Sequence, residues 1–93
     1  MILVYIDLKA GNVIKRIEDS DDTVVVPRTG EDVAFQHSSK PKSERFSVYN
    51  IREVIHLHNT RPHVVFAVCQ KQRADYAASG RLNGFLEAAG VDL

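Results

Sequence analysis

The chain has 93 residues, 44% apolar and 26% charged, a composition typical of one soluble globular domain with a modest core. Acidic and basic residues balance at twelve each, so no net charge is available to attract nucleic acid or an anionic membrane surface. The single cysteine, Cys69, excludes an internal disulfide framework and a thiolate zinc cluster, and is compatible with a reducing compartment.

The apolar opening, MILVYIDLK, has neither the basic leader nor the cleavage site of a signal peptide. No segment approaches the ~20 apolar residues of a membrane span. We therefore expect a cytoplasmic protein without membrane contact.

Alternating apolar residues predict short strands in the first half of the chain. Residues 2–8 carry apolar side chains on both faces, as an interior strand does, and residues 13–17 return as the second arm of a hairpin. A β-branched run follows at 23–26. Residues 33–35 form another short strand after a Pro-x-x-Gly turn.

In the second half, the apolar alternation of residues 46–57 changes phase near Asn50, which predicts a bulge or bend. Residues 63–70 form the last strand. We expect the core side of this hairpin to consist of Ile55, Leu57, Val64, Phe66 and Val68.

Helical spacing of apolar residues predicts a helix over residues 72–90 that ends at Gly90. Gly80 and Gly84 weaken this pattern. A break near Ser79, with a second short helix after it, is therefore a second interpretation.

Together these elements predict a mainly β (α+β) single domain over residues 1–93. It is a small, partly open five- to six-stranded antiparallel barrel at 2–70 with a C-terminal helix at 72–90. The segments PRTGEDVAF, RFSVYNIREVIHLH and PHVVFAVCQ resemble the compact barrels of the Src-homology-3 type found in many small phage and bacterial accessory proteins. The resemblance covers about half the chain and implies a fold but no activity.

His56, His58 and His63 surround one short turn. If residues 59–62 form a hairpin loop, the three imidazoles share one face, where zinc could bind them with a water as fourth ligand. Histidines on the outward face near a turn are also what an ordinary solvated surface contains. We expect the solvated surface and no cofactor, and keep zinc binding as the alternative.

Charged loops supply the other candidate sites. The basic residues Lys40, Lys42 and Arg45 precede Tyr49 and could contact a protein partner, or bind phosphates while the ring stacks on a base. An acidic loop could meet a basic partner through Asp19, Asp21 and Asp22. It lacks the glycine and glutamate of a calcium-binding EF-hand loop.

No catalytic pattern is present. The serines of the 37–43 loop have no partner at a diagnostic spacing, and no glycine-rich phosphate or dinucleotide motif occurs. We therefore expect a non-enzymatic protein-binding module that inhibits or regulates another protein, by analogy with phage accessory proteins that act on host proteins. The alternative partners are nucleic acid and a second copy of the chain, which would form a homodimer.

Overall fold

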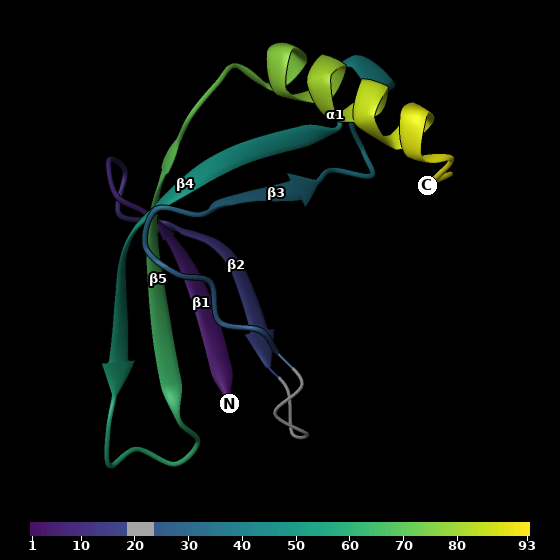
Figure 1. Cartoon of the computed structure of the whole chain (residues 1–93). Helices are drawn as coiled ribbons and strands as arrows, with labels where there is room; N and C mark the ends of the chain where they lie inside the picture. The colour runs from purple at the N-terminus through teal and green to yellow at the C-terminus, as the bar shows by residue number, and fades with distance from the viewer. Residues whose placement is uncertain (19–23) are drawn as a thin grey trace. The chain divides into compact units, whose positions relative to one another are not determined.

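The computed structural model describes residues 1–18 and 24–93. Its elements in chain order are β1 (Ile2–Asp7), β2 (Val13–Glu18), β3 (Asp32–Gln36), the short 3-10 helix η1 (Lys42–Glu44), β4 (Phe46–Leu57), β5 (Val64–Lys71) and α1 (Asp75–Ala89) (Figure 1). The predicted acidic partner residues Asp19, Asp21 and Asp22 lie outside the described residues.

The strands form one mixed sheet in the order β2-β1-β5-β4-β3. β1 pairs antiparallel with β2, where Leu3 is opposite Ile17, and parallel with β5, where Leu3 is opposite Val65. The mainly β fold with a C-terminal helix is therefore confirmed, but an all-antiparallel sheet is wrong. Residues 24–26 of the β-branched run lie outside the described strands.

Turn chemistry explains the β1–β2 hairpin. The Asp7 carboxylate accepts hydrogen bonds from the backbone N–H groups of Lys9 and Ala10 at 2.9 and 3.2 Å. Gly11 follows with a φ of +73°, a backbone conformation that side chains disfavour. The turn that the sequence predicts between these two strands is thus confirmed.

The chain divides into two compact units, and the division passes through three of the strands. The first unit consists of Met1–Val33 with Asn50–Gln70, and the second of Ala34–Tyr49 with Lys71–Leu93. β4 runs without interruption past Asn50, where the sequence pattern changes phase. The change of phase coincides with the boundary between the units.

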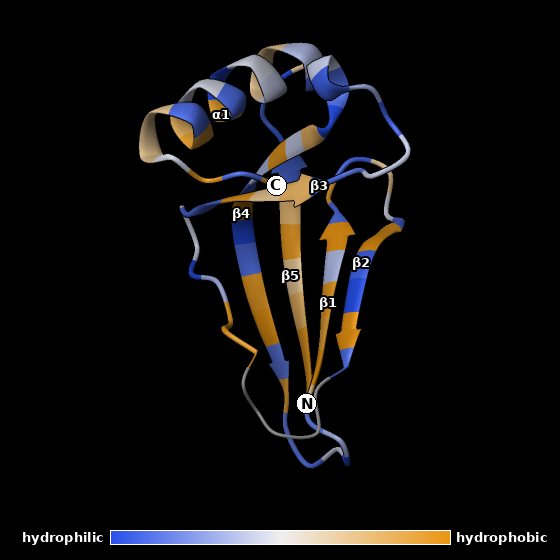
Figure 2. Cartoon of the chain, turned by 90° about the vertical axis from the view of Figure 1, so that its right-hand side faces the viewer, coloured by the Kyte–Doolittle hydropathy of each residue, from blue (hydrophilic) through white to orange (hydrophobic). Residues whose placement is uncertain are grey.

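The core of the first unit lies on one face of β1 and β5. Figure 2 shows that these two strands consist mainly of apolar residues. Its fully buried side chains include Leu3, Val65, Ala67 and Cys69. The predicted core side of the hairpin is wrong, since Ile55 and Leu57 are each 40% exposed and Val64, Phe66 and Val68 are half-buried. The parallel pairing with β1 sets Leu3 beside Val65 and Tyr5 beside Ala67, so the odd-numbered residues of β5 face the interior.

In the second unit, α1 buries only Ala78 and Ser79. The Ser79 hydroxyl accepts a hydrogen bond from the Phe46 N–H at 2.8 Å and lies 3.3 Å from the Phe46 carbonyl oxygen. Because this hydroxyl is hydrogen-bonded to the backbone of β4, it does not cap a second helix. The helix α1 is therefore continuous. The predicted end at Gly90 is confirmed by its φ of +70° and its N–H bond to the Glu87 carbonyl.

Among the described residues, no helix combines the length and apolar character needed to cross a membrane.

Candidate functional site

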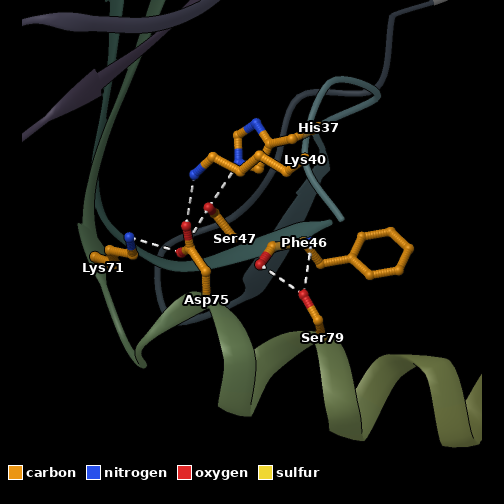
Figure 3. A network of polar contacts seen from close by, with 7 residues as sticks. All are labelled: His37, Lys40, Phe46, Ser47, Lys71, Asp75 and Ser79. Atoms are coloured by element: carbon orange, nitrogen blue, oxygen red, sulfur yellow. Dashed lines mark hydrogen bonds and ion pairs between the residues drawn. The ribbon is translucent and has the colours of Figure 1, made fainter. Parts of the chain in front are cut away.

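Asp75, at the start of α1, is the centre of a polar network in the second unit (Figure 3). Lys40 Nζ lies 2.8 Å from its Oδ2, and Lys71 Nζ lies 2.7 Å from its Oδ1. The Ser47 hydroxyl donates to Oδ1 at 2.9 Å, and its oxygen lies 2.7 Å from His37 Nε2. Side chains from a loop and two strands thus converge on one carboxylate of the helix.

His37, Ser47 and Asp75 are residue types of a nucleophilic triad, but their order differs. In a triad the imidazole lies between the hydroxyl and the carboxylate and accepts the hydroxyl proton. Here Ser47 donates to Asp75 and must accept from the N–H at Nε2 of His37. An imidazole protonated at that nitrogen cannot take the Ser47 proton, so the arrangement holds structure and does not activate a nucleophile.

The charge of Asp75 is stabilised by its neighbours. Burial alone would raise its pKa, but hydrogen bonds from Lys40, Lys71 and Ser47 outweigh that effect and hold the pKa of Asp75 well below its usual range. The same carboxylate raises the pKa of Lys40. Asp75 therefore stays ionised and ties the segment after β3 to the start of α1.

A cavity of about 630 Å³ lies in the second unit, lined by the loop before β4, one side of α1 and the residues that follow the helix. Lys42 and Arg45 line it from the loop, and Gly80, Asn83 and Gly84 line it from the helix. An added Cβ at either glycine would meet nothing within 4 Å, so the helix surface is open at both positions. The lining also includes two carboxylates, Glu87 and Asp92, so cations, carboxylates and an amide all surround the cavity.

Two polar atoms among the residues lining this cavity are unsatisfied. Asn83 Nδ2 donates to the Lys42 carbonyl at 3.0 Å, which identifies Oδ1 as the acceptor of that amide. Within the described part of the chain, Asn83 Oδ1 and Arg45 Nε are buried without a hydrogen-bond partner. The Arg45 guanidinium lies 5.0 Å from the centre of the Phe46 ring. Each unsatisfied buried group costs about 1–3 kcal/mol.

The structure separates the predicted basic cluster into two roles. Lys42 and Arg45 line the cavity, whereas Lys40 is paired with Asp75. The Tyr49 ring packs edge-on against Phe35, with ring centres 5.8 Å apart. Lys40 and Tyr49 thus both have partners within the chain.

The histidines lie together in the first unit, as the sequence predicted for one face of a hairpin tip. The ring centre of His63 is 5.4 Å from that of His56 and 5.8 Å from that of His58. The connection is longer than predicted, because β4 ends at Leu57 and β5 begins at Val64. As the rings are oriented, no three His, Cys, Asp or Glu side chains of the described residues are arranged to hold a metal ion.

Cys69 is fully buried, with its Sγ 3.5 Å from the Ile6 carbonyl oxygen. Burial, and secondarily the charge of Asp7, raises the pKa of the thiol to about 11. A buried, protonated thiol is a poor nucleophile.

Sequence reasoning missed Asp75, Ser47 and the helix side of the cavity. The spacing of Lys71 and Asp75, four residues apart, was the one local signal for the network. Asn83 and the two glycines carried none, because their role depends on which element packs beside α1.

The comparisons with known proteins found no similar family model, curated protein or solved structure.

Proposed function

We propose that the protein is a non-enzymatic protein-binding module that holds a segment of a partner polypeptide in the cavity between α1 and the loop before β4. The observation that carries the proposal is the pair of unsatisfied atoms, a donor at Arg45 Nε and an acceptor at Asn83 Oδ1, among the residues that line one cavity. A peptide group offers the complementary acceptor and donor. Both side chains are half-buried, so each can turn toward a bound segment.

Exposed side chains on α1 support the proposal that the ligand is a macromolecule. Large apolar side chains are exposed on or just after the helix, with Tyr76 at 69%, Phe85 at 56% and Leu93 at 62%. Exposed apolar surface beside polar groups is typical of protein interfaces.

Such a module acts by blocking or adapting the protein that it binds. We place it in the cytoplasm, where the free thiol of Cys69 stays reduced.

Affinity capture with purified protein tests the proposal. The tagged chain is incubated with lysate, with and without nuclease treatment. Bound polypeptides are identified and then titrated as purified proteins. The Lys42→Glu, Arg45→Gln double variant should bind the captured polypeptide at least tenfold more weakly than the unmodified chain. A matched control, Lys9→Glu with Arg52→Gln, makes the same charge changes in the first unit and should bind normally.

Equal binding by both double variants would contradict the proposed site. Capture that disappears with nuclease and weakens steeply with salt would instead support nucleic-acid binding. Capture of the chain by itself would identify a homodimer.

A further inference from the structure

The three histidines around the β4–β5 connection form a second cluster of polar side chains, apart from the network around Asp75. His56 is near the end of β4, His58 follows the strand, and His63 precedes β5 (Figure 1). His56 and His58 are exposed, and His63 is half-buried. Solvation alone would let these polar rings point apart, yet they converge.

The closest approach is between two ring nitrogens. His56 Nδ1 lies 3.3 Å from His63 Nε2, with the ring planes at 82°. This contact is a hydrogen bond between the two rings, at the long end of the usual range. Zinc–nitrogen bonds of about 2.0–2.1 Å at a tetrahedral angle place two ligand nitrogens about 3.3–3.4 Å apart. The two nitrogens already have the separation of a shared zinc ion.

The third ring is close but lies farther from the other two than this geometry requires. The His58 ring centre lies 6.3 Å from that of His56 and 5.8 Å from that of His63. Three imidazoles on one tetrahedral zinc have ring centres about 5 Å apart. Because His58 is exposed, its ring can approach by about 1 Å through side-chain rotation alone.

We propose that His56, His58 and His63 bind one zinc ion, with the His58 ring turning inward on binding and water as the fourth ligand. The site lies within the first unit and is independent of the proposed cavity ligand in the second. A zinc ion would link the end of β4 to the start of β5 and shorten the free part of their connection.

Isothermal titration of zinc chloride into the chain, prepared without a polyhistidine tag, tests the proposal. We expect one zinc per chain at neutral pH. His56→Gln, His58→Gln and His63→Gln should each weaken binding at least tenfold, because each removes one of three ligands. His37→Gln is the matched control, since it alters the remaining histidine in the other unit, and it should bind zinc as the unmodified chain does.

Nitrogen chemical shifts of the imidazole rings provide a readout that does not depend on substitutions. Zinc should shift one ring nitrogen of each of the three histidines and leave those of His37 in place. The proposal is overturned if no stoichiometric zinc binds, if His58→Gln keeps the full affinity, or if His37→Gln loses as much affinity as the others. The melting temperature of each variant without zinc verifies that all of them fold.

Discussion

At the scale of single residues, Asp75 and Ser79 determine how α1 attaches within the second unit. Asp75 accepts hydrogen bonds from Lys40, Lys71 and Ser47, and Ser79 contacts both polar backbone groups of Phe46. α1 buries few side chains, so these polar contacts supply a large share of its attachment. Removing either one should loosen the helix.

Asp75 predicts a dependence of stability on pH. Its folded-state pKa lies below the ordinary value of 3.8, so the carboxylate contributes stability that is present above about pH 4 and is lost as the pH falls through the folded-state pKa. We expect Asp75→Asn to lower the free energy of unfolding by about 1–2 kcal/mol at pH 7. Urea unfolding at several pH values should show the difference from the unmodified chain shrinking below pH 4; a constant difference would contradict this.

Removing the Ser79 hydroxyl should destabilise the fold, because the Phe46 N–H would lose its hydrogen-bond acceptor. Ser79 is fully buried, and its hydroxyl is 2.8 Å from the N–H of the buried residue Phe46. Ser79→Ala should lower the free energy of unfolding by about 1–3 kcal/mol. The control is Ser43→Ala, at an exposed position of η1, which we expect to stay within about 0.5 kcal/mol. Similar losses for both variants in urea unfolding would refute this role of Ser79.

At the scale of elements, α1 is a continuous helix in spite of two internal glycines. Gly80 and Gly84 have open space around them, and they line the cavity that we propose as the binding site. Glycine lowers helix stability, so at these positions the chain keeps a smooth helix surface at a cost in stability. Gly90 has the opposite role, because its φ of +70° ends the helix.

The three glycines therefore predict opposite effects of substitution by alanine. Gly80→Ala and Gly84→Ala should each raise the free energy of unfolding by about 0.5–1 kcal/mol, since nothing obstructs the new methyl group. Gly90→Ala should lower it by about 1 kcal/mol, because alanine resists the left-handed conformation. Thermal unfolding followed by circular dichroism at 222 nm measures all three, and a loss of stability at Gly80 would show that the position is not open.

At the scale of the whole molecule, the parallel pairing of β1 with β5 joins Leu3 to Val65 across most of the chain. It also decides which side of β5 is interior. Pairing between such distant segments is slow to form, because a long loop must close first. The first unit therefore depends on contacts that no local segment can supply.

Leu3 tests this dependence. It is 1% exposed, whereas Leu8, just after the same strand, is 53% exposed. Leu3→Ala should lower the free energy of unfolding by about 2–5 kcal/mol, and Leu8→Ala by less than about 1 kcal/mol. Urea unfolding measures both. Equal effects would mean that the β1–β5 pair is not the centre of this core.

Local signals in the sequence predicted the strands and the helix that the structure describes. Alternation predicted β1, β2, β3, β4 and β5, the glycine after the helix predicted its end, and the spacing of the histidines predicted that they share one hairpin tip. Each of these depends on residues close together in the chain, whose geometry follows from strand or helix periodicity.

Only the tertiary structure decided which elements pair and what their side chains meet. The β-branched residues at 24–26 had the propensity for a strand but form none in the described chain. The core side of β5 was predicted wrongly, because both sides carry apolar residues and only the parallel neighbour β1 selects one of them. Asp75, Asn83 and Ser79 gained their roles in the same way. Periodicity determines the faces of an element, whereas burial and hydrogen bonding depend on partners that are distant in the sequence.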